Sequence, residues 1–312
     1  MILATLPYPE INPVLVPIWG AIAIRWYALS YIAGLMFGWW AMARMTHERQ
    51  LWKNPTFSNK APITADQVGD LVVWATLGVI LGGRIGWILF YGIALCGVSP
   101  GSAMCAGPLG GHTLPLDFLD HPLRLIEVWE GGMSFHGGLA GVVLAVWLFC
   151  RRNKLQLLPV ADMLAVVAPI GLFFGRLANF VNGELWGKVT DVPWAMVFCN
   201  KFIRAAHGGT CPAGPDPRHP SQLYEAALEG IVLFLILQFA LRRLKLNERP
   251  GLLTGMFFLG YGLFRFLVEF FREPDGPFLG WFSMGMALSI PLWAAAGAFL
   301  WISLRPHVNG RA

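Results

Sequence analysis

The chain has 312 residues, of which 56% are hydrophobic and only 13% are charged. Because a soluble domain carries about 25% charged residues, this composition argues against an ordinary water-soluble protein and indicates one that lies in a membrane. The formal net charge of +5 would suit a nucleic-acid partner, but most basic residues fall between apolar runs, where they orient a membrane protein. We therefore expect no nucleic-acid partner.

Seven apolar segments are long enough to cross a bilayer as helices. We predict an all-α integral membrane protein that forms a single transmembrane domain, with spans at about 17–43, 68–96, 135–150, 160–178, 226–241, 252–271 and 282–304. The proline-rich stretch 186–224 is too irregular to cross the membrane and is predicted to form a small head between the fourth and fifth spans.

Lys and Arg are concentrated in alternate connections, at 44–60, 151–154, 242–249 and after 304. The positive-inside rule then predicts a periplasmic amino terminus and head and a cytoplasmic carboxyl terminus. Residues 1–20 contain four prolines and no basic residue, so we do not expect a cleaved signal peptide.

Glycines in the first two spans predict close helix packing. Gly34 and Gly38 form a small-xxx-small pair in the first, and the second has a four-residue repeat at Gly78, Gly82 and Gly86. Near the outer end of the first span lie Trp26, interpreted as part of an interfacial aromatic belt, and Tyr27. Arg84 lies inside the second span, where it can snorkel to the interface, pair with a carboxylate or bind a lipid phosphate.

The Gly/Pro-rich segment 96–133 is predicted to be an outer loop with short interfacial helices, one of them at 123–129. Its Asp117, Asp120 and His121 fit no recognised metal-ligand spacing, so no metal site is expected. Four of the five cysteines are predicted to face the outer compartment, where Cys96–Cys105 and Cys199–Cys211 can form bridges or stay free thiols.

The third span begins in the glycine-rich stretch 132–138, which contains His136. A histidine in apolar surroundings is often a hydrogen-bonded core group, but an imidazole that titrates near neutrality also suits proton transfer. His136 is therefore a candidate for either role.

The fourth span ends in a dense polar cluster, with Arg176, Asn179, Asn182 and Glu184 within nine residues. A charge at membrane depth costs roughly 2.5–3.5 kcal/mol even on the lenient insertion scale, so such groups are rarely idle. Arg176 can form a structural ion pair with Glu184 or Glu269, or its planar fork can bind two phosphate oxygens. We favour the phosphate interpretation, because an ion pair does not explain the neighbouring asparagines.

The sixth span has a second polar cluster, Tyr261, Arg265, Glu269 and Arg272, whose spacing predicts one helical face. Arg265 and Glu269 can pair within the helix, which leaves Arg272 toward the outer surface. Before the fifth span, His219 or Ser221 can cap the helix or contact an incoming peptide.

The string Gly-Arg-x-x-Asn-Phe-x-Asn-x-Glu-x-x-Gly at 175–187 resembles the signature of the prolipoprotein diacylglyceryl transferase family. Similar matches are Gly-Gly-Arg-Ile-Gly-Trp-x-x-Phe-Tyr at 82–91, Gly-Met-Ser-Phe-His-Gly-Gly at 132–138 and His-Pro-Ser-Gln-Leu-Tyr-Glu at 219–225. At 25–28 the chain has Arg-Trp-Tyr-Ala where members of the family commonly have glycine last. Relative to the family, 97–115 is an insertion without assigned function.

The resemblance implies a bacterial inner-membrane enzyme that moves the diacylglyceryl group of phosphatidylglycerol to the lipobox cysteine of a prolipoprotein signal peptide. Its partners are these two substrates and the membrane lipid, and it requires no cofactor or metal. Together with the chemistry above, it gives three catalytic candidates, His136, Arg176 and Arg265. The substrate-binding candidates are Tyr27, Arg84, Asn179, Asn182, Glu184, Gly187, Tyr261, Glu269 and Arg272.

Each candidate group has a predicted task. Arg176 and Arg265 would stabilise the departing phosphate, and Glu184 and Glu269 would hold arginines in place. His136 would either accept the thiol proton or position the headgroup, because a positive surrounding stabilises thiolate but also weakens a histidine base.

Two rival functions follow from the same residues. A lipid or anion transporter could use the arginines as a translocation site, but no internal repeat is visible in the sequence. A purely structural scaffold does not need four arginines within or at the edges of its spans.

Overall fold

The computed structural model describes residues 6–19, 22–90, 126, 132–273, 277–279 and 282–305. The chain divides into two compact units, one made of Met1–Pro62 and Leu158–Ala312 and the other of Ile63–Leu157. The insertion 97–115, the Cys96–Cys105 pair, the acidic and histidine residues at 117–121 and most of the expected interfacial helix at 123–129 lie outside the described residues.

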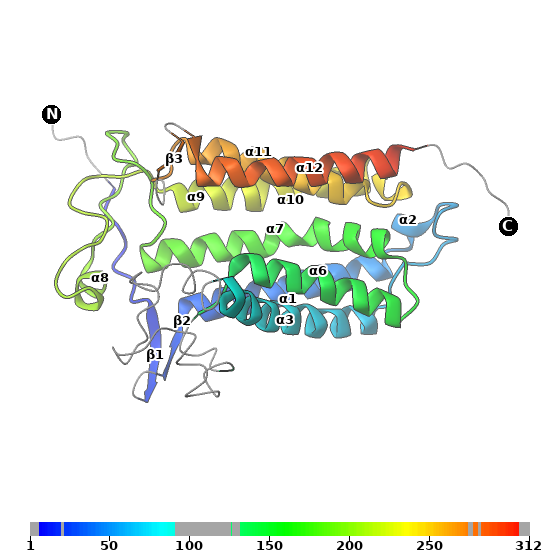
Figure 1. Ribbon diagram of the computed structural model, residues 1–312, viewed down its shortest axis with the longest axis horizontal. Helices are drawn as coiled ribbons and strands as arrows, with labels where there is room; N and C mark the ends of the chain where they lie inside the picture. The colour runs from blue at the N-terminus through cyan, green and yellow to red at the C-terminus, as the bar shows by residue number, and fades with distance from the viewer. Residues whose placement is uncertain are drawn as a thin grey trace. The chain divides into compact units, whose positions relative to one another are not determined.

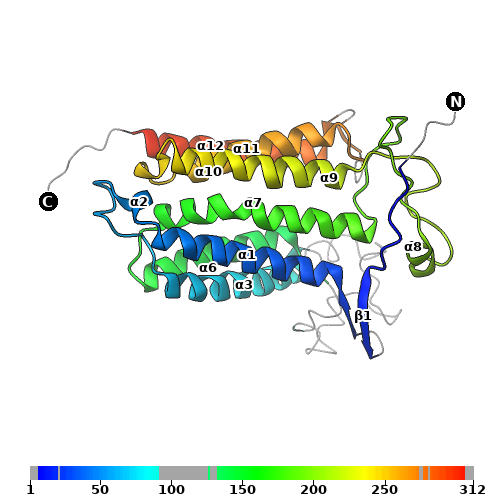
Figure 2. The ribbon, with the colours of Figure 1, turned by 180° about the vertical axis from the view of Figure 1, so that it is seen from behind.

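Long helices that run side by side form the first unit (Figure 1). They are α1 (Trp26–His47), α7 (Leu157–Asn182), the continuous run of α9 (Ser221–Glu225), η5 (Ala226–Val232) and α10 (Leu233–Arg242), then α11 (Leu252–Glu269) and α12 (Met284–Leu304). Short helices α2 (Arg49–Trp52), η6 (Leu246–Glu248) and α8 (Lys201–Ala206) lie in the connections. Both views show α7 and α11 ending, and α1, α9 and α12 beginning, toward the end that carries α8 (Figures 1 and 2).

Short antiparallel hairpins precede two of these helices. Strands β1 (Val14–Trp19) and β2 (Ile22–Arg25) precede α1, and β3 (Pro277–Leu279) and β4 (Phe282–Ser283) precede α12. The first predicted span, 17–43, is therefore wrong at its start, because residues 17–19 and 22–25 are strand and the helix begins at Trp26. Pro17 lacks a backbone donor and disfavours helix in the residue before it, whereas the β-branched neighbours favour an extended chain.

The other helix boundaries differ from the predicted spans by a few residues. The fourth helix covers 157–182 and the fifth begins at 221, both beyond the predicted ends. The sixth ends at Glu269 instead of 271 and the seventh begins at Met284 instead of 282. These shifts follow from capping and turn residues, which an apolar run alone does not locate.

In the second unit, α3 (Ala65–Trp87) packs against α6 (Phe135–Arg152) through the predicted glycine seam. A Cβ atom on Gly82 would lie 2.4 Å from the carbonyl oxygen of Gly137, and one on Gly78 would lie 2.6 Å from that of Gly141. Only glycine permits this approach. Thr64 starts α3 with a capping box to Gln67.

Within the described residues, helices long and apolar enough to cross a bilayer are Ala65–Phe90, Leu157–Asn182, Ser221–Arg242, Leu252–Glu269 and Met284–Leu304. The protein is thus a mostly helical, multi-pass membrane protein. Helices α1 and α6 cover most of the first predicted span and the whole of the third but do not meet this criterion.

The segment between α7 and α9 folds onto the amino-terminal residues. Tyr8, Phe198, Ile203 and Ala213 form its buried apolar cluster, and the Asn200 side chain caps α8. Of the two alternatives left open for Cys199 and Cys211, bridge or free thiols, the structure has the disulfide, and Cys150 in α6 is a buried free thiol. The bridge and the cluster fix the connection that follows the polar end of α7.

Candidate active site

The Arg176 side chain points from α7 toward two carboxylates of the helix formed by α9, η5 and α10. Its Nε lies 3.3 Å from Oε2 of Glu225, and its Nη2 lies 3.2 Å from Oε2 of Glu229. Both glutamates are completely buried. The alternative considered for Arg176 from the sequence, an ion pair with Glu184 or Glu269, is therefore replaced by pairs with Glu225 and Glu229.

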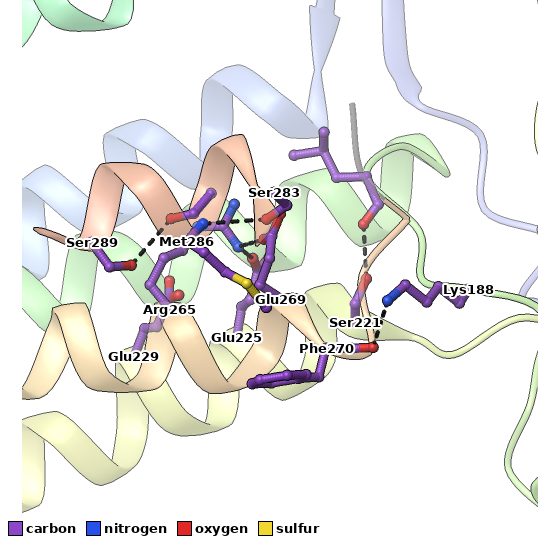
Figure 3. A network of polar contacts seen from close by, with 12 residues as sticks. Lys188, Ser221, Glu225, Glu229, Arg265, Glu269, Phe270, Ser283, Met286 and Ser289 are labelled. Carbon is purple, nitrogen blue, oxygen red and sulfur yellow. Dashed lines mark hydrogen bonds and ion pairs between the residues drawn. The ribbon is translucent and has the colours of Figure 1, made fainter. Parts of the chain in front are cut away.

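Arg265 reaches the same carboxylate from α11. Its Nη1 lies 3.1 Å from Oε1 of Glu225 and 2.7 Å from Oε2 of Glu269 (Figure 3). The predicted pair within the sixth helix is confirmed. Glu225 thus joins Arg176 and Arg265, which lie far apart in the sequence, in one buried chain of charges.

Glu225 and Glu229 are the site residues that the sequence analysis missed. Glu229 lies inside the predicted span 226–241, and an acidic group at membrane depth is itself a signal of function. The helix widens into a π-turn at this place, over Ala226–Val232, a distortion that is frequent at functional sites. Gly230 in this turn packs on Phe173 of α7, where a Cβ would lie 2.7 Å from the Phe173 Cβ.

Both guanidinium groups have N–H donors that the carboxylates do not use. Among the described residues, Nη1 of Arg176 and both Nε and Nη2 of Arg265 have no ion-pair or hydrogen-bond partner. The two arginine side chains remain 16% and 13% exposed, whereas Glu225 and Glu229 are fully enclosed. The remaining donors can therefore bind an anion while the carboxylates hold the forks in place.

The start of α12 fixes Glu269. Ser283 caps this helix and its hydroxyl donates a 2.7 Å hydrogen bond to Oε1 of Glu269 (Figure 3). Gly285 leaves room for the carboxylate, since a Cβ there would lie 2.5 Å from the Glu269 Cδ. Arg265 is thus anchored from two helices.

The polar turn after α7 is built around Glu184. The side-chain amides of Asn179 and Asn182 donate to its Oε1 at 2.9 and 3.1 Å. Gly183 and Leu185, on either side, both have left-handed backbone angles, with φ of 66° and 59°. For Leu185 this conformation is strained, which is common at functional sites. The prediction that Glu184 holds an arginine is wrong, because its partners are the two asparagines.

The first turn of α9 bonds to the backbone of this loop. Ser221 Oγ donates to the Leu185 carbonyl at 2.9 Å, and Gln222 Nε2 donates to the Glu184 carbonyl at 2.6 Å. Among the described residues no side chain caps α9, so neither Ser221 nor His219 takes the capping role, which was the alternative to contact with an incoming peptide. The loop and the helix that carries Glu225 form one connected structure.

Gly187 lies where two segments approach closely. Its N–H donates to the His219 carbonyl at 2.9 Å, and a Cβ would meet the Phe271 carbonyl oxygen at 2.5 Å. Gly187 also forms an antiparallel bridge with Arg272. Arg272 is buried and lies beyond the end of α11, so the four polar residues do not share one helical face as predicted.

The two predicted tyrosines lie beside the charged groups. The Tyr27 hydroxyl is 3.1 Å from that of Tyr31 and within electrostatic range of Arg176 and Glu184. Tyr261 stacks on Phe257, with ring centroids 5.9 Å apart, and is within electrostatic range of both arginines. Tyr27 is therefore close to both the charged chain and the polar turn.

The remaining candidates, Arg84 and His136, belong to the second unit. Arg84 is buried, donates to the Gly132 carbonyl at 3.1 Å and lies 4.8 Å over the Trp87 ring. Its burial rules out snorkelling. His136 is exposed in the first turn of α6, edge-on to Phe135.

Comparison with known proteins gives a consistent result. The family model described as prolipoprotein diacylglyceryl transferase matches residues 13–302. The chain is 47% identical over 310 residues to the phosphatidylglycerol–prolipoprotein diacylglyceryl transferase of Caulobacter sp. strain K31, covering 96% of each chain. It is 48% identical to that of Caulobacter vibrioides strain NA1000 over 98% of this chain and 97% of the relative. Identity to the enzyme of Allorhizobium ampelinum is 46%, over 99% and 94%.

Proposed function

Because the chain belongs to the prolipoprotein diacylglyceryl transferase family, we propose that it transfers the diacylglyceryl group of phosphatidylglycerol to the lipobox cysteine of prolipoproteins. In this reaction the cysteine sulfur attacks the glycerol carbon that carries the phosphate. A carbon–sulfur bond forms, the carbon–oxygen bond breaks, and glycerol phosphate leaves with that electron pair. The thiol proton passes to a base or to the departing phosphate. This is the first step of lipoprotein maturation.

The pair of arginines around Glu225 is the observation that supports this chemistry most directly. Negative charge accumulates on the departing phosphate, and fixed donors aimed at that charge lower the barrier in a water-poor site. Arg176 and Arg265 come from different helices, share one buried carboxylate and keep spare N–H groups. In this proposal the carboxylates set the direction of the forks, and the spare groups bind the phosphodiester.

His136 is the candidate for the thiol proton, and positioning of the headgroup is its rival role. The pH–rate profile of His136→Asn separates the two. A base role predicts that the variant loses a limb of the wild-type profile, whereas substantial activity with an unchanged profile would favour positioning.

For the architecture we propose seven spans in the bacterial inner membrane, with α1 and α6 added to the five apolar helices. Within the first unit, helices α1, α10 and α12 end opposite α8 (Figure 1). Basic residues lie in the last turns of these helices or directly after them, at Arg44, Arg49, Arg242, Arg243 and Arg305. The positive-inside rule then makes that end cytoplasmic and the head at 186–224 periplasmic, as is the amino terminus.

The proposal is tested with purified protein in detergent, phosphatidylglycerol and a lipobox peptide. A peptide that gains the mass of one diacylglyceryl group supports the proposed transfer. Release of one glycerol phosphate per modified peptide would agree with the stoichiometry of the proposed step. Transport is the alternative outcome: lipid movement in reconstituted vesicles without modified peptide would overturn the enzyme proposal.

A further inference from the structure

We call Arg176 and Arg265, which share Glu225, the arginine clamp. The polar turn after α7 carries hydrogen-bond acceptors that this clamp does not explain. Among the described residues, no cation pairs with Glu184 and no donor reaches its Oε2. Asn179 and Asn182 direct their amide donors at Oε1, so their own Oδ1 atoms stay available as acceptors. All three side chains are partly exposed. A half-buried carboxylate held by two amides, instead of by a cation, is suited to accept hydrogen bonds from a ligand.

A further acceptor lies in the first turn of α9, which is hydrogen-bonded to this loop. Gln222 is completely buried and donates through Nε2 to the Glu184 carbonyl, yet its Oε1 has no partner among the described residues. The turn is therefore rich in acceptors, whereas the arginine pair offers only donors. A ligand that meets both must carry an anion and hydrogen-bond donors, and the glycerol hydroxyls of an anionic phospholipid supply such donors without adding a charge.

We infer that Glu184, Asn179 and Asn182 form the subsite for the glycerol hydroxyls of the phosphatidylglycerol headgroup, and so determine which anionic phospholipid is used. This inference rests on the proposed function. The phosphodiester is bound by the arginine pair, and the diol beyond it donates to Glu184 Oε2 and the asparagine Oδ1 atoms. Each hydroxyl donor thereby meets an acceptor that the protein leaves open.

The spacing of the two subsites supports this assignment. Arg176 and Asn179 are three residues apart on α7, which is about 4.5 Å along the helix axis and close to one turn. Residues three apart lie on one face of a helix, so the arginine pair and the acceptor turn lie next to each other at the end of α7.

The subsite predicts discrimination by hydroxyl groups, not by charge. Phosphatidylmethanol has the same phosphodiester and the same single negative charge but no headgroup hydroxyl. A hydrogen bond to a charged acceptor contributes roughly 1.5–3 kcal/mol, so phosphatidylglycerol should bind about tenfold tighter or more.

The test is calorimetric titration of the purified full chain in detergent with short-chain forms of both lipids. For the wild type we expect the tenfold preference. In Glu184→Gln the affinity for phosphatidylglycerol should fall to about that for phosphatidylmethanol, so that the ratio of the two affinities is near one. The affinity for phosphatidylmethanol itself should not change. Asp191→Asn, which removes an exposed carboxylate of the head, should keep the wild-type ratio. Asn182→Ala should reduce the ratio in the same direction as Glu184→Gln.

Three results would overturn the subsite. The first is a wild type that binds both lipids with equal affinity. The others are a Glu184→Gln variant that keeps the wild-type affinity ratio and one that lowers the affinity for both lipids by the same factor. The wild-type comparison needs no substitution, so a misfolded variant does not remove the test. Arg176→Lys identifies failure of the clamp separately: if both affinities stay unchanged in that variant, the clamp is wrong, whatever the lipid ratio.

Discussion

Arg176 presents a planar fork with donors on three nitrogen atoms, and the structure uses only two of them on Glu225 and Glu229. A lysine at this place keeps the charge but has a single nitrogen. It can satisfy a buried carboxylate or a phosphate oxygen, but it cannot hold the fixed geometry that serves both.

We therefore predict that Arg176→Lys lowers the rate of diacylglyceryl transfer about a hundredfold or more while membrane insertion is unchanged. The rate is measured with a lipobox peptide and phosphatidylglycerol. Arg242→Lys is the control, because Arg242 forms a surface pair with Glu48 away from this site. Near-normal transfer by Arg176→Lys would exclude the clamp.

Glu225 has a different task, because it is the carboxylate that both arginines share. A glutamine is isosteric but has one acceptor oxygen, and its amide donors would face a guanidinium group. Removing one partner of a buried ion pair typically costs about 3–5 kcal/mol, since the remaining charge stays enclosed.

We predict that Glu225→Gln lowers both the thermal unfolding midpoint in detergent and the turnover number. Glu225→Asp should also be impaired, because the shorter side chain cannot reach both guanidinium groups. Glu248→Gln, at the other end of the first unit, should match the wild type in both measurements. A Glu225→Gln protein with wild-type stability and turnover would show that the shared carboxylate is dispensable.

At the scale of elements, α12 supports the site although it contributes no charged residue to it. Gly285 lies against the Glu269 carboxylate, and a Cβ there would come within 2.5 Å of Oε2. An alanine must push the carboxylate away from Arg265 and Ser283. Gly297, on the same helix, has open space around its Cβ position and gives a matched control.

Gly285→Ala should therefore reduce transfer about tenfold or more, since it disturbs hydrogen bonds to charged groups. Gly297→Ala should leave the rate unchanged. The comparison uses initial rates at saturating lipid, so that a loss of turnover is distinguished from weaker binding. Equal rates in the two variants would mean that α12 does not set the position of Glu269.

Asp162 joins two helices at the opposite end of the first unit. Its Oδ2 accepts from the Gly251 N–H at 2.7 Å, and its Oδ1 accepts from the Thr254 N–H and hydroxyl at 2.8 and 2.7 Å. It thus caps the first turn of α11 from α7.

We predict that Asp162→Ala destabilises the fold by about 1–3 kcal/mol, because it leaves buried donors unsatisfied. Thr254→Val removes only the hydroxyl and should have a smaller effect in the same direction. Thermal unfolding in detergent measures both. Transfer per folded molecule should persist, and its loss in either variant would contradict a purely structural role.

Helices with long apolar runs could be located from the sequence, and so could the glycine seam between α3 and α6, because length and spacing carry those signals. The β1–β2 hairpin could not, since an apolar run ahead of Trp26 does not distinguish strand from helix. The pairing of Arg176 with Glu225 and Glu229 depends on how two distant helices are rotated, which no local pattern specifies. Only the pair within one helix, Arg265 and Glu269, followed from spacing.

At the scale of the whole molecule, the arrangement makes a prediction about sidedness. Within the first unit, α1, α9 and α12 begin and α7 and α11 end toward α8, and basic residues follow the opposite helix ends (Figure 2). The site residues Arg176, Glu225 and Arg265 lie nearer the α8 side of their helices. In the proposed function a lipobox cysteine is modified at the outer surface, and this proposal requires the α8 side to be periplasmic.

Cysteine labelling in intact cells tests the orientation. In a parent with Cys96, Cys105 and Cys150 replaced by serine, Asp191→Cys should react with a membrane-impermeant maleimide, and Lys245→Cys should react only after lysis. The Cys199–Cys211 disulfide does not react with the maleimide in either variant, because it has no free thiol. The two positions lie on the head and after α10, so positive-inside orientation demands opposite behaviour. If Lys245→Cys were labelled in intact cells, the orientation would be the reverse of the predicted one. The arginine pair would then lie on the side of the membrane away from the exported substrate.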